Sequence, residues 1–384
     1  MKRILAAAAS LTALGGLGLG WIIARRITAP VGSRRYDLAI RGLEDDGERK
    51  LVVLDRNSRT ESKGIYCLLF PDEEWLQLSD EVLDRGPDRI ARPISGIAPG
   101  STPQVGDYAS WSGIYFTTPS DAGLVAREVT IENSAGDSPA WLIDGTHAAS
   151  TWAIHLHGLG GSRAGTLRGA QVATDLGYTS LIITYRNDGD GPVVARARST
   201  LGFTEVADAE SAVDFALAHG ARRIVLFGWS MGAVIATLLM QRNRRPGTIA
   251  ALVLESPVLD WPATIRANCA RAGLPAAAGW LALPWLGATP MSRLVGLPVA
   301  LPLWRSSRAS RERPRVPTLV LQGSADDSVL THVVEEIARR YPGDMEMQVF
   351  EAAHTMTWNS DPERWRSTVS TWLTERVSTG ARGL

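Results

Sequence analysis

From about residue 125 the chain alternates short apolar runs with helix-forming segments. The apolar runs predict strands over residues 128–131, 140–143, 152–156, 180–185, 223–227, 249–254, 318–321 and 346–350. The clearest helices are predicted over residues 204–219, 329–340 and 362–376. Strands that alternate with helices build doubly wound, mostly parallel sheets. The pattern therefore predicts an eight-stranded α/β domain over residues 125–384.

The N-terminal segment shows a different pattern. Residues 4–24 carry no charge and lie between Lys2-Arg3 and Arg25-Arg26. A helix of about 20 apolar residues spans the hydrocarbon layer of a bilayer. A cleaved signal peptide is the alternative, but no small-x-small cleavage site is well placed after the apolar run. We therefore expect residues 1–26 to form a single-pass membrane anchor. The flanking charges do not decide on which side of the membrane the rest of the chain lies.

Two further regions flank or interrupt the α/β pattern. Residues 27–124 contain short candidate strands at 50–55, 65–70 and 75–78, separated by Gly, Pro, Asp and Ser, and predict a small β-rich region. An insertion over residues 257–315 is uncharged from 272 to 292. Its prolines argue against one uninterrupted helix, so we expect a helical cap over the main domain.

The cap has an apolar composition that suggests contact with substrate. Trp280 and Trp285 lie in its uncharged part, and we expect both to line the substrate cleft. A surface cap normally shows charges at helical spacing on its outer face. Because this one shows almost none, we expect one face to cover the cleft and the other to meet lipid or residues 27–124.

Overall composition narrows the class of function. Lys and Arg together number 40, as do Asp and Glu, so no net field favours nucleic acid. The two cysteines, Cys67 and Cys269, do not have the spacing of metal ligands, and neither a phosphate-binding loop nor a dinucleotide fingerprint occurs. We expect a small-molecule substrate, and neither a cofactor nor a metal.

A Gly-x-Ser-x-Gly pentapeptide at residues 228–232 has Ser230 at its centre. It follows the predicted strand 223–227 and precedes the helix-forming run 233–242, which is the context of a nucleophile elbow. The glycines suit a strained turn that closes against the following helix. A glycine-rich turn with a buried, unreactive serine could have the same sequence. The other residues of the chain must therefore decide whether Ser230 is a nucleophile.

Two polar residues follow other predicted strand ends. Asp326 comes shortly after strand 318–321, and His354 follows strand 346–350. Loops at the carboxyl edge of a parallel sheet converge, so we expect both residues near Ser230. His354 would take the serine proton, and a buried carboxylate would orient the imidazole ring.

The neighbouring acid is an alternative for the third role. Asp327 directly follows Asp326, and only one of the two is expected to face the histidine. We favour Asp326 because it lies three residues after the strand-end Gly323. The loop 157–161, His-Gly-Leu-Gly-Gly, follows strand 152–156 and can turn backbone N–H groups toward a reacting carbonyl. We expect the N–H groups of Leu159 and Met231 to form an oxyanion hole.

Taken together, these motifs resemble those of the α/β-hydrolase superfamily. The likeness rests on the loop 157–161, the pentapeptide 228–232, residues 323–326 and His354 with residues 358–362, and it covers residues 125–384. Within the superfamily the chain resembles serine-aminopeptidase-like and BEM46-like hydrolases of actinobacterial type. The resemblance implies an α/β-hydrolase fold and a Ser-Asp-His triad, and leaves residues 27–124 unexplained.

Three functions remain open at this point. We favour a membrane-anchored serine hydrolase that acts on carboxylic esters with an apolar acyl group. A peptidase acting on short or blocked peptides would use the same triad, but no acidic pair that would hold a peptide amino terminus is evident. A catalytically silent binding protein is the third possibility, and the complete set of motifs counts against it.

Overall fold

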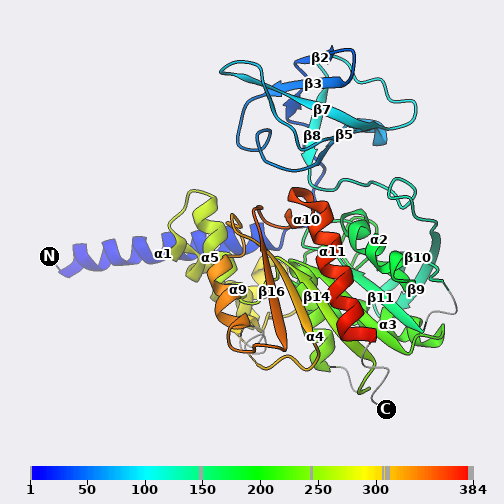
Figure 1. The fold of residues 1–384 in the computed structure, drawn as a ribbon. Helices are drawn as coiled ribbons and strands as arrows, with labels where there is room; N and C mark the ends of the chain where they lie inside the picture. Colours follow the sequence, from blue (N-terminus) through cyan, green and yellow to red (C-terminus); the bar gives the residue numbers. More distant parts are fainter. Residues whose placement is uncertain (1, 147–149, 243–244, 305–306, 308–311, 379–384) are drawn as a thin grey trace.

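The computed structural model describes residues 2–146, 150–242, 245–304, 307 and 312–378, and the side chains of residues 2–14 and 72 lie outside this description. The chain forms an N-terminal helix, a small β domain and a larger α/β domain (Figure 1). In this view the β domain lies above the α/β domain, beside the short helix α10 (Thr357–Ser360).

The α/β domain is built on one eight-stranded sheet. Its order is β16-β15-β14-β13-β11-β12-β10-β9, and β10 runs antiparallel to both of its neighbours while the other pairs are parallel. The strands are β9 (Arg127–Asn133), β10 (Gly136–Ile143), β11 (Thr151–Leu156), β12 (Thr179–Ile183), β13 (Arg223–Trp229), β14 (Ile249–Glu255), β15 (Thr318–Gly323) and β16 (Met345–Phe350). The predicted strands and the mostly parallel sheet are confirmed.

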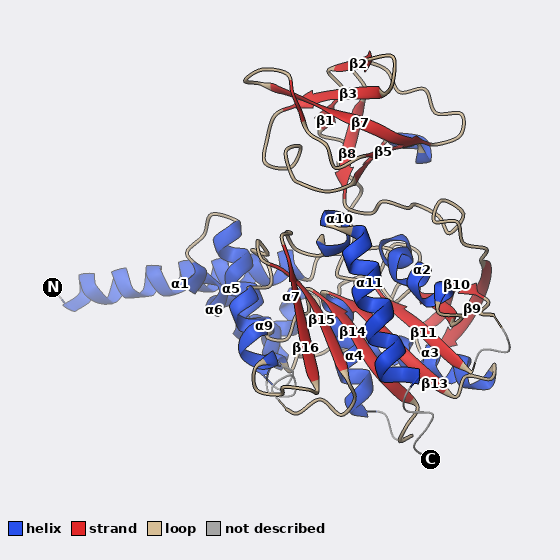
Figure 2. Ribbon diagram, viewed as in Figure 1, coloured by secondary structure: helices blue, strands red, loops and turns tan. Residues whose placement is uncertain are grey.

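Helices cover both faces of this sheet (Figure 2). One face packs on α3 (Val206–Ala218), α4 (Met231–Arg242) and α9 (Thr331–Ala338), and the other on α2 (Leu167–Asp175) and α11 (Pro362–Leu373). Successive residues of β13 alternate between the two cores: Leu226 belongs to the first, and Val225 and Phe227 to the second. A continuous apolar strand is thus buried on both faces, as expected of a central parallel strand.

The sheet of the β domain is antiparallel, and residues such as Leu54, Leu68 and Ile90 form a separate apolar core. Its strands are β1 (Leu38–Ala39), β2 (Gly42–Asp45), β3 (Lys50–Asp55), β4 (Tyr66–Leu69), β5 (Trp75–Leu78), β6 (Leu83–Asp84), β7 (Arg89–Ile97) and β8 (Tyr108–Ser112). The predicted β-rich region is confirmed, although the sequence pattern missed β1, β2, β6, β8 and the longest strand, β7. That strand contains Pro93, which lies where its partner changes from β3 to β5.

The N-terminal segment forms helix α1 (Lys2–Ile27). Over the residues that are described, no helix is both long enough and apolar enough to cross a bilayer. The predicted membrane span over residues 4–24 is therefore not supported, and the side chains of its residues 4–14 lie outside the description. Near its C-terminal end the helix is part of the protein core instead, because Ile23 and Ala24 are buried in the main apolar cluster.

The insertion after β14 forms the expected helical cap. It contains α5 (Trp261–Arg271), α6 (Gly279–Gly287) and α7 (Thr289–Val295), with a short 3₁₀ turn before α6. Proline occupies the first turns of α5 and α7, where its missing N–H costs no hydrogen bond. Contacts between α6 and α1 are extensive, so the outer face of the cap meets α1 rather than the β domain.

Candidate active site

Ser230 lies on the turn between β13 and α4. Its φ of 52° is a left-handed conformation that non-glycine residues rarely adopt. A Cβ atom at Gly232 would lie 1.9 Å from the carbonyl oxygen of Leu156, and one at Gly228 would lie 2.8 Å from the backbone of Ala233. Both glycines are therefore required for this turn to pack, as expected of a nucleophile elbow.

The structure brings the three residues predicted for the triad together. His354 Nε2 lies 2.9 Å from Ser230 Oγ, and His354 Nδ1 lies 2.8 Å from Asp326 Oδ2. The residues follow β13, β15 and β16, whose carboxyl ends share one edge of the sheet. In this arrangement Nδ1–H donates to the carboxylate, which leaves Nε2 free to accept the serine proton.

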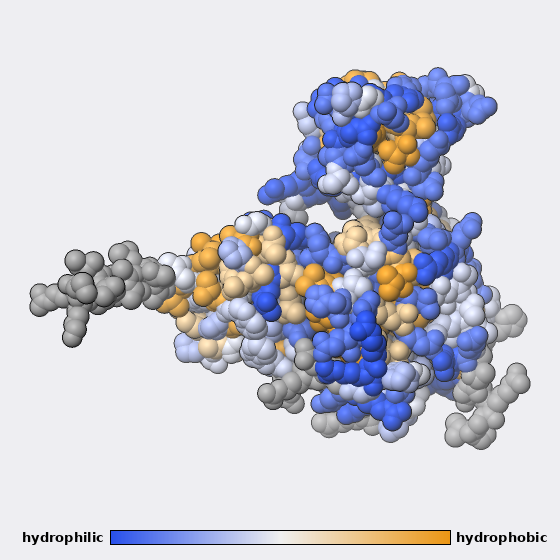
Figure 3. Space-filling view, turned by 60° about the vertical axis from the view of Figure 1, so that its left-hand side comes forward, coloured by the Kyte–Doolittle hydropathy of each residue, from blue (hydrophilic) through white to orange (hydrophobic). Residues whose placement is uncertain are grey.

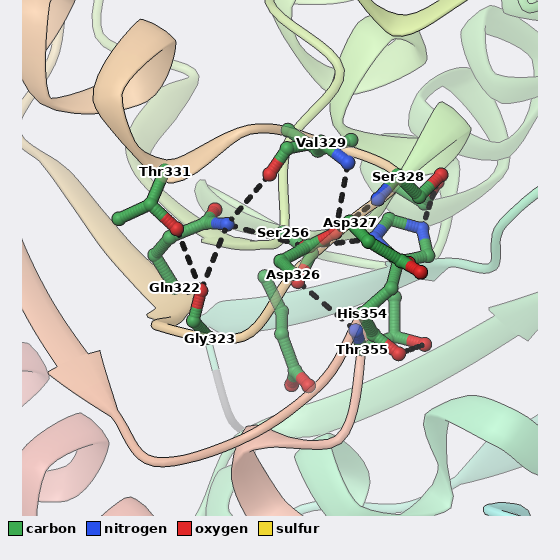
Figure 4. A network of polar contacts seen from close by, with 12 residues as sticks. Ser256, Gln322, Gly323, Asp326, Asp327, Ser328, Val329, Thr331, His354 and Thr355 are labelled. Carbon is green, nitrogen blue, oxygen red and sulfur yellow. Dashed lines mark hydrogen bonds and ion pairs between the residues drawn. The ribbon is translucent and has the colours of Figure 1, made fainter. Parts of the chain in front are cut away.

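Asp326 is fixed by the turn that follows β15 (Figure 4). Its Oδ1 accepts the backbone N–H groups of Ser328 and Val329, at 3.0 and 2.8 Å, and its Oδ2 also accepts from Gln322 Nε2 at 3.2 Å. Burial alone would raise the pKa of the carboxyl, but the hydrogen bonds from His354 and Val329 outweigh it and hold the pKa below its usual value. Asp326 is thus ionised at neutral pH, as its role requires.

Asp327 points away from this network. Its side chain is 63% exposed, and an Arg271 nitrogen lies 3.9 Å from its carboxylate. The Asp326 side chain, by contrast, is fully buried against His354. The geometry thus separates the two neighbouring acids in the way that the spacing from Gly323 predicted.

The two residues whose amides were predicted for the oxyanion hole lie beside Ser230. Gly158 lies so close to the elbow that an added Cβ would be 3.2 Å from Ser230 Cβ, which places Leu159 at the mouth of the site. Met231 is the first residue of α4, and its N–H points out of the helix start. Among the described backbone bonds, neither the Leu159 nor the Met231 N–H donates to another carbonyl.

The side chain of His157 holds the loop 157–161 in place. Its Nε2 lies 2.8 Å from Asp188 Oδ2, its Nδ1 lies 2.9 Å from the carbonyl oxygen of Gly158, and its ring lies against Tyr185. These contacts give His157 a structural role in positioning the loop. Asp188 was not predicted, because it lies in a loop after β12 with no local motif.

A buried ion pair lies beneath the loop that carries His354, and the sequence analysis missed it as well. Arg168 of α2 donates to Glu255 at 3.3 Å, to the carbonyl oxygen of Thr355 at 3.0 Å and to Asn359 at 3.1 Å. Burial lowers the pKa of the Arg168 guanidinium, and the Glu255 charge opposes that shift. Glu255 also accepts from Trp229 Nε1 at 2.9 Å, and its backbone oxygen accepts the Ser230 N–H. The pair thus connects Trp229, which precedes Ser230, with Thr355, which follows His354.

The same network reaches the β domain. Asn359 donates its amide hydrogens to the carbonyl oxygens of Ile65, at 2.8 Å, and Gly113, at 3.0 Å. The Ile65 N–H in turn donates to the carbonyl oxygen of Asn359. These bonds join the β domain to the loop that carries His354.

We expect Glu255→Gln to destabilise the protein by about 3–5 kcal/mol, because it leaves the Arg168 charge buried without a counter-charge. The matched control is Asp175→Asn, which breaks the solvent-exposed pair with Arg366 and is expected to cost about 1 kcal/mol or less. Urea unfolding followed by tryptophan fluorescence measures both values. Equal, small losses for the two variants would contradict the importance of the buried pair.

Two cavities flank Ser230. The smaller cavity, of about 200 Å³, is lined in part by Gly113 and Ile114, which follow the last strand of the β domain. The larger, of about 550 Å³, lies under α5 of the cap and is lined by Trp261 and Ile265. Ser230 and His354 belong to the lining of both. The larger volume falls in the range typical of small-molecule sites.

The prediction that Trp280 and Trp285 line this cleft is wrong. Neither belongs to the lining of either cavity beside Ser230. Trp280 is 42% exposed and stacks on Trp304, and Trp285 lies against Gly20 of α1. Helix α6 packs against α1, and the cap residues that line the larger cavity beside Ser230 come from α5 and the turn that follows it instead. Trp261 of α5 takes the place that the sequence assigned to them.

Comparison with known proteins supports the α/β-hydrolase fold. The model of the alpha/beta hydrolase family matches residues 153–368, and a domain family of unknown function, DUF8805, matches residues 39–112. No curated protein sequence matches the chain.

Solved structures resemble the α/β domain. The esterase Pf2001 of Pyrococcus furiosus is 22% identical with a TM-score of 0.53, over 67% of this chain and 96% of that one. Est1E from Butyrivibrio proteoclasticus, solved with ferulic acid bound, is 17% identical with a TM-score of 0.50, over 65% of this chain and 99% of that one. At these identities the likeness is one of fold. With a family match that spans more than half of its length, the chain belongs to the alpha/beta hydrolase family.

Proposed function

We propose that the protein is a serine hydrolase that cleaves carboxylic esters with an apolar acyl group through an acyl-enzyme. The observation that carries the proposal is the hydrogen-bonded series Ser230–His354–Asp326 beside a large, mainly apolar cavity. A serine hydroxyl is a poor nucleophile at neutral pH, and an oriented histidine is the group that activates it.

The reaction follows from this placement. Ser230 Oγ bonds to the ester carbonyl carbon while its proton passes to His354 Nε2, and the negative oxygen forms beside the N–H groups of Leu159 and Met231. His354 then gives the proton to the leaving alkoxide as the carbon–oxygen bond breaks. A water molecule repeats the sequence on the acyl-enzyme, with His354 as base, and releases the carboxylic acid.

The cavity linings favour an ester over a peptide. Among the residues that line the two cavities beside Ser230, none is an aspartate or a glutamate that would bind a peptide amino terminus. The larger lining is mainly apolar, with residues such as Val258, Trp261 and Leu274.

The strained serine argues against a silent binding protein. A left-handed backbone at a non-glycine residue costs about 1–3 kcal/mol, and binding alone does not require it.

We expect kcat/KM to rise with acyl length in the series p-nitrophenyl acetate, butyrate, hexanoate and octanoate. Burial of each methylene contributes about 0.8 kcal/mol, so four carbons give about 3 kcal/mol, or roughly a hundredfold, until the cavity fills. Trp261→Ala, which enlarges the cavity, should move the optimum to longer chains. Trp280→Ala, at an exposed tryptophan outside the cavity, is the matched control and should leave the profile unchanged.

The same assay separates the two enzymatic possibilities. Aminoacyl p-nitroanilides are run beside the esters at equal concentration. A flat ester profile, or faster cleavage of the anilides than of every ester, would contradict the ester proposal and favour a peptidase.

A further inference from the structure

Helix α1 forms part of the wall of the larger cavity beside Ser230. We propose that this cavity contains a subsite for an anionic group of the substrate, formed by Arg26 of α1 and Arg271 of α5. The inference rests on the proposed ester hydrolase function and names its substrate class more closely. The substrate would be an ester whose apolar chain carries a carboxylate or phosphate away from the scissile bond.

The position of α1 is the first step of the argument. Ile23, Arg26 and Ile27 line the same cavity as Ser230 and His354. Their spacing of three and four residues places them on one face of the helix. Other apolar side chains of α1 are exposed, with Leu17 at 47% and Ile22 at 55% (Figure 3). Helix α1 therefore turns a defined set of side chains toward the reacting serine.

Several contacts fix the helix in this place. A Cβ atom at Gly20 would lie 2.2 Å from the carbonyl oxygen of Leu281, so the two backbones touch. Trp21 Nε1 donates to the carbonyl oxygen of Leu294 at 3.3 Å.

The C-terminal end of α1 is held by a buried arginine. Arg198 donates to the carbonyl oxygen of Arg25 at 2.8 Å and to Thr28 Oγ1 at 3.1 Å. This arginine satisfies one of the carbonyl groups that the helix end leaves without partners. The backbone of Arg26, one residue beyond Arg25, is thereby fixed at the cavity.

The charges around the cavity are the second step. Among its lining residues two are arginines and none is a carboxylate. Arg26 makes no ion pair with any residue that the structure describes. Arg26 is exposed and the Arg271 side chain is 52% exposed, so their attraction for an anion is partly screened by water and salt.

The second arginine is oriented by its own helix. Arg271 Nη2 donates to Asn268 Oδ1 at 2.7 Å, and Asn268 Nδ2 donates to Ser328 Oγ at 3.0 Å and to the carbonyl oxygen of Thr264 at 2.8 Å. Asp327 lies 3.9 Å from Arg271, too far for a hydrogen bond, and is solvent-exposed. Arg271 thus retains donors for a ligand.

The test compares mono-p-nitrophenyl suberate, which ends in a carboxylate, with its neutral methyl ester, on the full-length protein. The readout is the ratio of kcat/KM for the anionic ester over the neutral one. We expect the parent ratio to be about tenfold or more in low salt, and to fall as sodium chloride is raised. Arg26→Gln and Arg271→Gln should each lower the ratio several-fold, and the double variant should bring it close to one.

Arg25→Gln is the matched control, because the Arg25 side chain lies over the Trp21 ring and does not line the cavity. Its ratio should equal that of the parent. A parent that cleaves both esters equally well, or an Arg25 variant that loses as much preference as the Arg26 variant, would overturn the subsite. Failure to cleave either ester would overturn the proposed function itself, so the two failures are distinguishable.

Discussion

Replacement of Ser230 by alanine is expected to lower kcat for ester hydrolysis by about 10⁶-fold, the loss that follows removal of a triad serine in comparable enzymes. Ser230 Oγ is the oxygen that lies 2.9 Å from His354 Nε2, so its removal leaves the histidine without the nucleophile that it activates. The variant is assayed with p-nitrophenyl hexanoate, with active-site purity checked by mass spectrometry.

The alanine variant should remain folded. Alanine removes only the hydroxyl, and the turn is fixed by the flanking Gly228 and Gly232. An unchanged melting temperature, or a slightly raised one, is expected because catalytic geometry often costs stability. Undiminished turnover in a folded Ser230→Ala protein would show that another residue is the nucleophile.

Replacement of Asp326 by asparagine is expected to lower kcat by roughly 10⁴-fold. One side-chain oxygen must still accept the N–H groups of Ser328 and Val329, so the new amide nitrogen faces His354 Nδ1. That contact favours the tautomer with the proton on Nε2, which cannot accept the proton of Ser230. The pKa of the Asp326 carboxyl is lowered in the folded state, so this group also stabilises the protein at neutral pH and less as the pH falls through its titration.

The neighbouring acid supplies the control. Asp327→Asn alters an exposed side chain outside the catalytic network and is expected to change kcat for a neutral ester by less than about twofold. Both variants are measured with the same ester over pH 6–9. A larger loss for Asp327→Asn than for Asp326→Asn would assign the orienting role to the other residue.

The positions of the triad residues were predictable because each follows a strand that the apolar pattern identifies. Parallel strands end at one edge, so three loops far apart in sequence must converge there. The choice of Asp326 over its neighbour was predictable for a related reason, since residues that follow the strand-end Gly323 at short range remain close to that edge. Asp326 lies 2.8 Å from His354 Nδ1 and Asp327 is exposed, as the spacing predicts.

The role of α1 was not predictable from hydropathy. An uncharged, Ala- and Gly-rich segment has the same pattern whether it meets lipid or protein, and in this chain its last turns pack against the cap. The tryptophans of α6 were placed wrongly for the same reason. A helix that is apolar all round does not reveal which side faces the cleft.

The buried network beneath the site left no local signal either. Arg168 and Glu255 are 87 residues apart, and Asn359 contacts Ile65 across 294 residues. Only the folded topology brings such groups together. The contact of Asn359 with the β domain joins residues that are far apart in the sequence. The sequence pattern of residues 27–124 therefore did not reveal it.

Covalent labelling tests the central claim most directly. The full-length protein is incubated with a fluorophosphonate, digested and mapped by mass spectrometry, while turnover of p-nitrophenyl hexanoate is followed in parallel. The account predicts one phosphonylated residue, Ser230, and a loss of turnover in proportion to labelling. An unlabelled Ser230 in protein that still hydrolyses the ester, or a label on another residue that abolishes turnover, would contradict it.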